Sequence, residues 1–147
     1  MNAFSRLALA ALVPVALGTM AFSATEAEEP FTLIHDASET TLEDWAWQKR
    51  VVVVFADNPN DPRFAKQMEL INDRPEALLD RDVVVITDTD PAADSAVRHK
   101  LRARGFMLVV LAKDGSVVIR KPAPWDMREI SRSIDKLPLR QQEIRER

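Results

Sequence analysis

Two runs of β-branched residues place the strongest constraint on the fold of this chain. Residues 51–56 and 83–87 consist mainly of valine and isoleucine, and neither run alternates apolar with polar side chains. A strand with one face in water alternates, whereas a strand covered on both faces is apolar throughout. We therefore predict two central, parallel strands with helices packed on both faces of the sheet.

The segment between these runs has the features of a crossover helix. Asp61 precedes Pro62, which supplies a helix N-cap and a proline at the first helical position. Three apolar residues then recur at helical spacing, namely Phe64, Met68 and Ile71. Pro75 restarts the pattern, so this connection is either one bent helix or two short ones.

A second helix is predicted after the second run. Asp90 and Pro91 repeat the same opening, and Gly105 is placed to end the helix. The apolar stripe of this helix consists of Ala93, Val97 and Leu101. The order up to this point is strand, helix, strand, helix, which is typical of parallel βαβ units.

Residues 106–112 and 117–120 predict a pair of antiparallel strands. Both are apolar runs, and they flank Asp114-Gly115, a dipeptide typical of tight hairpin turns. The connection has only four residues, so it leaves no room for a helix between these two strands.

The C-terminal segment predicts one more helix. Asp126 is placed as its N-cap and Glu129 as the second member of a capping box, and Pro138 ends the helix. Residues 139–147 form a charged tail that we expect to fray.

The predicted order β-α-β-α-β-β-α is that of the thioredoxin fold. This fold is an α/β three-layer sandwich, here with a mixed four-stranded sheet. A flavodoxin-like sheet is the alternative, but it needs a helix between its last two strands. We assign the thioredoxin-like domain to residues 41–138, with an N-terminal lead-in over residues 24–40.

Residues 1–23 have the pattern of a secretory signal peptide. Arg6 precedes an apolar run that is too short and too interrupted for a membrane span. Small residues at Ala21 and Ser23 fit a cleavage site before Ala24, and Thr25-Glu26-Ala27 offers an alternative site after Ala27. We therefore expect a periplasmic or secreted protein that has no transmembrane anchor after cleavage.

Several short motifs resemble those of a known family. They are Leu42-x-x-Trp45 with Arg50, Gln67, Arg81-Asp82, Lys113-Asp114-Gly115-x-Val117 with Arg120, and residues 137–143. Over residues 31–145 the chain resembles the prokaryotic DUDES family (domain of unknown function 4174). The resemblance implies a thioredoxin-like fold, export and kinship with a domain of animal matrix-associated proteins, and it implies no established catalytic residue. Ser116 departs from the second glycine expected in the hairpin.

The chain has no cysteine, which excludes thiol-disulfide chemistry and zinc-thiolate sites. Thioredoxin-like folds carry a dithiol after the first central strand and a cis-proline before the third, and here residues 57–62 and 104–106 occupy these places. The two histidines, His35 and His99, are expected to be solvated. A net charge of -3 does not fit the basic face of a nucleic-acid-binding protein. We expect neither a cofactor nor a nucleic-acid partner.

Acidic residues follow both central runs. Asp57 and Asp61 come after the first run, and Asp88 and Asp90 come after the second. In open α/β sheets these loops meet at the edge where ligands bind, and carboxylates suit Mg²⁺ or Ca²⁺. Asp61 and Asp90 also precede prolines and are placed as helix caps. Asp57 and Asp88 are therefore the remaining candidates for a weak cation site.

Two further features are candidates for contacts with a partner. Trp45 and Trp47 lie two residues apart, so they cannot both be fully buried on one face, and the exposed one would mark a protein contact. A basic run is interpreted as the solvated face of a helix, with a patch for an anionic partner as the alternative: Arg98, Lys100, Arg102 and Arg104.

Together these features favour an exported, non-catalytic module that binds a periplasmic or envelope protein. The alternative is a divalent-cation-dependent binder or hydrolase that uses the acidic loops. A third hypothesis is a former redox chaperone that retains peptide binding in the thioredoxin groove. No catalytic residue is assigned.

Overall fold

The computed structural model describes residues 31–147, and the predicted signal peptide lies outside them. The strands are β1 (Ile34–Asp36), β2 (Arg50–Phe55), β3 (Val83–Asp88), β4 (Met107–Leu111) and β5 (Val117–Lys121). The α-helices are α1 (Pro62–Asp73), α2 (Pro75–Leu79), α3 (Ala96–Leu101), α4 (Met127–Asp135) and α5 (Pro138–Arg145). Two 3₁₀ turns are η1 (Glu43–Trp45) and η2 (Pro91–Ala93). No helix in this part of the chain is long and apolar enough to cross a membrane.

The strands form one sheet with the order β1-β3-β2-β4-β5. The parallel pairing of β2 with β3 and the antiparallel pairing of β4 with β5 are as predicted. In addition, β1 is parallel to β3, and β4 is antiparallel to β2. The sheet has five strands rather than the predicted four, because β1 pairs with the outer edge of β3. The sequence of β1 is Ile-His-Asp, so no apolar run marks this strand.

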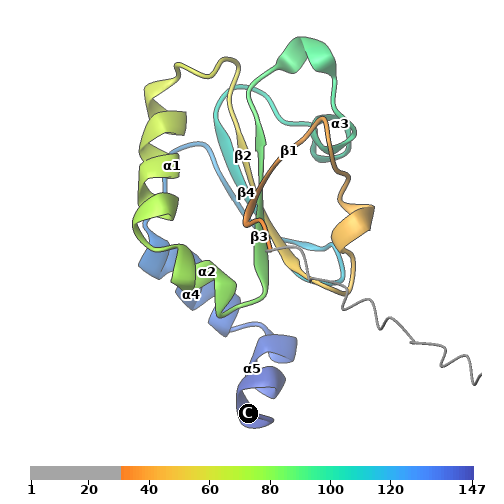
Figure 1. Cartoon of the computed structure of the whole chain (residues 1–147), viewed down its shortest axis with the longest axis vertical. Helices are drawn as coiled ribbons and strands as arrows, with labels where there is room; N and C mark the ends of the chain where they lie inside the picture. Colours follow the sequence, from red (N-terminus) through yellow and green to blue (C-terminus); the bar gives the residue numbers. More distant parts are fainter. Residues whose placement is uncertain (1–30) are drawn as a thin grey trace, which may run out of the picture. The chain divides into compact units, whose positions relative to one another are not determined.

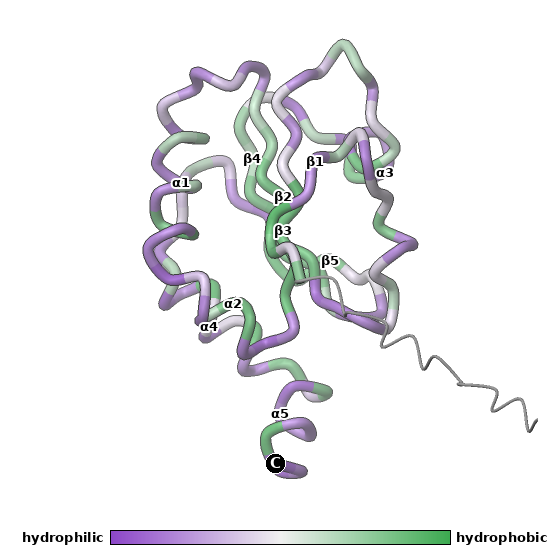
Figure 2. Tube along the Cα trace, in the orientation of Figure 1, coloured by the Kyte–Doolittle hydropathy of each residue, from purple (hydrophilic) through white to green (hydrophobic). Residues whose placement is uncertain are grey.

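Strands β2 and β3 are buried on both faces, as their composition predicts. Alternate side chains enter two separate cores: Val52 and Val54 belong to one, and Val51 and Val53 to the other. Helices α1, α2 and α4 contribute to the first core, and α3 contributes to the second. Figure 1 shows these helices on opposite faces of the sheet, and in Figure 2 hydrophobic strands lie between more hydrophilic helices. The three-layer α/β architecture is confirmed.

The predicted helix caps before α1 and α4 are confirmed. The Asp61 side chain accepts a hydrogen bond from the Arg63 backbone N–H at 2.9 Å, and Asp126 accepts one from Arg128 N–H at 2.7 Å. The crossover connection is two helices rather than one bent helix, since the non-helical backbone of Arg74 separates α1 from α2.

The helix predicted to begin at Asp90 is interrupted. Asp90 caps only the short turn η2, and Asp94 then adopts a left-handed conformation with φ of 44°. Ser95 caps the helix α3 by accepting a hydrogen bond from Arg98 N–H at 3.0 Å. The predicted C-cap at Gly105 is also wrong, because Arg102 ends the helix with φ of 52°.

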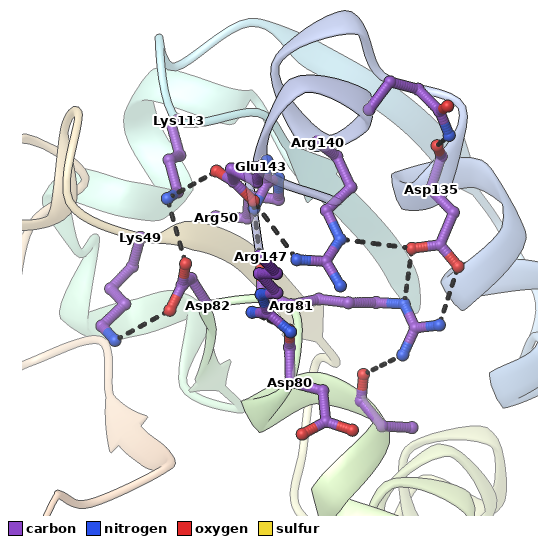
Figure 3. Close-up of polar contacts among 12 residues, drawn as sticks. Lys49, Arg50, Asp80, Arg81, Asp82, Lys113, Asp135, Arg140, Glu143 and Arg147 are labelled. Atoms are coloured by element: carbon purple, nitrogen blue, oxygen red, sulfur yellow. Dashed lines mark hydrogen bonds and ion pairs between the residues drawn. The ribbon is translucent and has the colours of Figure 1, made fainter. Parts of the chain in front are cut away.

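The prediction that residues 139–147 fray is wrong, because most of this segment forms α5. Ion pairs hold the helix (Figure 3). Arg50 is 1% exposed and donates hydrogen bonds to both carboxylate oxygens of Glu143, at 3.1 and 3.2 Å, and to the carbonyl of Arg81 at 2.8 Å. Lys113 contacts the same Glu143 carboxylate at 2.8 Å and Asp82 at 3.1 Å.

A second set of ion pairs joins α5 to α4. Arg140 is buried and lies 3.4 Å from Asp135 and 3.3 Å from Glu143. Arg81 forms a bidentate ion pair with Asp135, in which Nε and Nη2 donate to the two carboxylate oxygens at 2.9 and 2.7 Å. These residues make one network, called the α5 network below: Lys49, Arg50, Arg81, Asp82, Lys113, Asp135, Arg140 and Glu143. Most of them belong to the motifs that carry the family resemblance, so those motifs converge in space.

We predict that Glu143→Gln lowers the free energy of unfolding by about 2 to 3 kcal/mol at pH 7, because it leaves the buried Arg50 without its carboxylate. Burial by itself raises the pKa of Glu143, but contacts with Lys113, Arg50 and Arg140 outweigh it and lower the pKa from 4.5 to about 2. The stability contributed by this carboxylate is therefore complete above pH 4.5 and is lost as the pH falls toward 2.

Denaturant unfolding between pH 2 and pH 7 measures both effects. The wild-type protein should lose stability over this acid range, and the Glu143→Gln variant should lose less. Glu146→Gln is the matched control, since Glu146 is an exposed residue at the end of α5. A Glu143→Gln variant as stable as the control would contradict the role of the α5 network.

Candidate functional site

The loop after β2, where a thioredoxin-like dithiol would lie, is a turn held by its own polar side chains. Asn58 accepts a hydrogen bond from Asn60 N–H at 2.9 Å. Asp61 caps α1 and also accepts hydrogen bonds from the guanidinium of Arg63 at 3.1 and 2.8 Å. The carboxylate of Asp61 is thus committed to the start of the helix.

A buried ion pair lies at the ends of β2 and β3. The side chain of Asp88 is 3% exposed and that of Arg98 is 7% exposed, and their closest atoms are 2.8 Å apart. Ser95 Oγ donates to the other carboxylate oxygen at 2.6 Å. Arg98 also donates to the carbonyl of Ala56 at 2.8 Å, so one guanidinium joins α3 to both central strands.

The expectation that Arg98 lies on the solvated face of its helix is wrong. The other three residues of the basic run, Lys100, Arg102 and Arg104, are exposed. Arg98 is buried while the others are exposed because the buried carboxylate of Asp88 requires a positive partner. Since Asp88 belongs to a strand, ten residues before Arg98, the pattern of the helix alone does not reveal this pair.

Asp57 and Asp88, the two candidates for a cation site, lie on either side of the Arg98 side chain. Asp57 is 57% exposed and lies 3.6 Å from Arg98 Nη1. The guanidinium therefore supplies the positive charge that a cation at these two carboxylates would supply. Among residues 31–147, no group of three or more histidine, aspartate or glutamate side chains is arranged to hold a metal ion.

A cavity of about 650 Å³ opens at the ends of β1 and β3. Six acidic residues line it: Asp36, Glu39, Asp44, Asp88, Asp90 and Asp94. The predicted acidic edge therefore gathers Asp88 and Asp90, whereas Asp57 and Asp61 do not line this cavity. Hydrogen bonds from Ser38 lower the pKa of Asp36, and those from Thr41 lower the pKa of Asp44. The Asp90 carboxylate accepts a hydrogen bond from Ala92 N–H, and Asp88 is paired with Arg98, so four of the six carboxylates have partners.

Trp45 and Trp47 have different environments. Trp45 is partly buried, donates a hydrogen bond from Nε1 to Thr40 Oγ1 at 2.9 Å, and packs its ring against His35 at 4.9 Å. Trp47 is 73% exposed, and its backbone has φ of 63°. The Trp47 N–H donates to the carbonyl of Lys113 at 2.7 Å, which fixes this loop against the hairpin.

A cavity of about 330 Å³ lies beside Trp47 and is called the Trp47 pocket. Apolar side chains from the start of α5 form much of its wall: Leu137, Pro138 and Leu139. Arg50 and Lys113 of the α5 network also line it. Sequence reasoning missed this pocket because it depends on the docking of α5, which was expected to fray.

Solved structures of redox proteins share the fold of this chain. Plasmodium yoelii thioredoxin peroxidase I has a TM-score of 0.54 and 14% identity, over 70% of this chain and 80% of that chain. A reduced 2-Cys peroxiredoxin of Plasmodium vivax has a TM-score of 0.54 and 12% identity, over 71% and 85%. A chloroplastic thioredoxin z has a TM-score of 0.54 and 14% identity, over 74% and 96%. The fold is therefore thioredoxin-like, and at these identities the likeness is one of fold alone.

The family model described as "Domain of unknown function (DUF4174)" matches residues 41–143. The chain belongs to this family, which confirms the resemblance of its motifs to domain of unknown function 4174. No protein of curated function matches the chain by sequence.

We predict that Asp88→Asn destabilises the protein by about 3 kcal/mol, because it leaves the buried Arg98 without its carboxylate. This loss corresponds to a fall of about 10 °C in the thermal midpoint. Asp57→Asn is the matched control and should change the stability by less than about 0.5 kcal/mol, since Asp57 is exposed. Thermal unfolding followed by circular dichroism measures both.

The same assay tests the cation hypothesis. Because Arg98 lies between the two carboxylates, millimolar Mg²⁺ or Ca²⁺ should leave the thermal midpoint of the wild-type protein unchanged. A rise of several degrees that Asp57→Asn abolishes would contradict this assignment and restore the cation site.

Proposed function

We propose that this chain is an exported, non-redox binding module that acts in the envelope of a prokaryotic cell. Its binding site is the Trp47 pocket, and its partner is a protein segment that presents one apolar side chain flanked by carboxylates. The observation that carries the proposal is the exposed Trp47 in a left-handed conformation beside this pocket.

The backbone of Trp47 supports a role in binding. A bulky residue at φ of 63° has a conformational cost of about 1 to 3 kcal/mol, and such strain persists mainly at functional sites. Glycine would adopt this conformation without that cost. The ring is 73% exposed, so burial in this domain does not offset the strain. A partner that covers the Trp47 ring would supply the burial that this domain does not.

The shape and composition of the Trp47 pocket suit an apolar anchor. Its volume of about 330 Å³ is at the lower end of the range of ligand sites. Leu139 is 42% exposed at its rim. Tryptophan is enriched among the residues that dominate binding energy, and such residues act by excluding water from a packed centre. An apolar side chain buried between Trp47 and Leu139 would have this geometry.

The charges near the pocket favour an acidic partner. Three charged residues line the pocket, Arg50, Lys113 and Asp114, which is an excess of one positive charge in a chain whose net charge is -3. Opposite charges on a partner would raise its rate of association and set its orientation.

The absence of cysteine supports binding rather than redox activity. Thiol-disulfide exchange requires a thiolate, and the chain has none to supply. In addition, the loop that would hold the dithiol is committed to capping α1. The fold therefore serves here as a scaffold without the chemistry of its redox relatives.

Export is supported by the pattern of residues 1–23. The site of action would be the periplasm or the cell exterior, where the absence of cysteine avoids unwanted disulfides. Mass spectrometry of the protein recovered from the envelope fraction should find Ala24 at its N-terminus. Recovery of uncleaved protein from the cytoplasm alone would contradict export.

Binding is tested with synthetic peptides and NMR. The probe is a heptapeptide with a central leucine between glutamates, and the control peptide has lysines in place of the glutamates. The indole N–H signals of the tryptophans report which ring responds. We predict a saturable shift of the Trp47 signal with the acidic peptide and a much weaker response to the basic one.

Two variants test whether the peptide binds at the Trp47 pocket or elsewhere on the surface. Trp47→Ala should weaken binding of the acidic peptide at least tenfold, whereas Trp125→Phe, a change at a partly buried tryptophan distant in sequence, should leave it unchanged. Equal responses to the two peptides, or equal binding by wild type and Trp47→Ala, would contradict the proposal.

A further inference from the structure

A groove between α2 and α4 collects four arginines. It has a volume of about 310 Å³, and it is called the arginine groove here. Its polar lining consists of Arg74, Arg81, Arg128, Ser131, Arg132 and Asp135. Only one of these side chains is a carboxylate, so the lining of the groove is strongly basic in a chain that is acidic as a whole.

Two of the four arginines are engaged by carboxylates. Arg81 forms its bidentate ion pair with Asp135, and Arg132 forms an ion pair with Glu129 at 3.1 Å. In contrast, Arg74 and Arg128 form no ion pair with any residue in the described part of the chain. The groove therefore contains two guanidinium groups whose charge is not balanced by an ion-pair partner.

The two unpaired arginines come from elements that are distant in the sequence. Arg74 separates α1 from α2, and Arg128 lies in the first turn of α4. Both also line an adjoining cavity of about 370 Å³, together with Asp73 and Asp126. Asp126 is occupied as the N-cap of α4, and neither acid pairs with these arginines. The packing of the helices thus places two free cations at one opening.

We propose that the arginine groove binds a phosphate group. Two guanidinium groups match the charge of a phosphate dianion, and the fork of N–H donors on each arginine matches its oxygen geometry. The Ser131 hydroxyl is a further donor in the lining. The phosphate belongs either to a free phosphate compound or to the headgroup of an anionic lipid, and this site is independent of the Trp47 pocket.

Inorganic phosphate is the first probe. Isothermal titration of the purified protein at constant ionic strength should show saturable binding by the wild type. Arg74→Gln combined with Arg128→Gln should weaken it at least tenfold. The control, Arg104→Gln with Arg145→Gln, removes two other exposed arginines that form no ion pair in the described residues, and it should bind phosphate as the wild type does.

Vesicles distinguish the two sources of the phosphate. Binding to phosphatidylglycerol vesicles but not to phosphatidylcholine vesicles, with loss in the groove variant and competition by phosphate, would support a lipid headgroup. Phosphate binding without vesicle binding would support a free compound. The proposal is overturned if the wild type shows no saturable binding of phosphate or vesicles, or if the groove and control variants lose binding equally. Thermal midpoints of both variants near that of the wild type would show that folding is intact.

Discussion

The burial of β2 and β3 on both faces is the constraint on which the rest of the structure depends. Their valines require helices above and below the sheet, which makes the three layers. A buried arginine lies at each end of this strand pair. Arg50 contacts Glu143 of α5 at one end, and Arg98 contacts Asp88 at the other. Each guanidinium also donates to a backbone carbonyl, of Arg81 and Ala56 respectively. The charged groups thus connect peripheral helices to the central strands.

This arrangement has a consequence for function. The ends of the parallel strands, where open α/β proteins usually bind ligands, hold an ion pair between Arg98 and Asp88 whose donors and acceptors are largely satisfied. The features that lack an internal explanation lie elsewhere, at the strained and exposed Trp47 and at the unpaired arginines of the groove. A chain without cysteine has retained the thioredoxin-like scaffold, and its surface is the place where binding is proposed.

What could be predicted from the sequence was local. Continuous valines identified β2 and β3, and the aspartates before Pro62 and Met127 identified two helix starts, because these signals depend only on neighbouring residues. The failures involve partners in other secondary-structure elements. The helical pattern predicts a solvated Arg98 because its partner Asp88 belongs to a strand, and the C-terminal segment predicts a frayed tail because the partners of α5 lie in three other segments. The Trp47 pocket and the arginine groove exist only after the helices have packed.

Hydrogen exchange measured by NMR at pH 7 tests most directly whether buried arginines join the outer helices to the central strands. If they do, the free energies of opening measured at the amides of Gln141 in α5 and His99 in α3 should lie within about 2 kcal/mol of the value for Val53 in β2. Exchange of the α5 and α3 amides at the rate of an unstructured peptide, while β2 stays protected, would contradict this account.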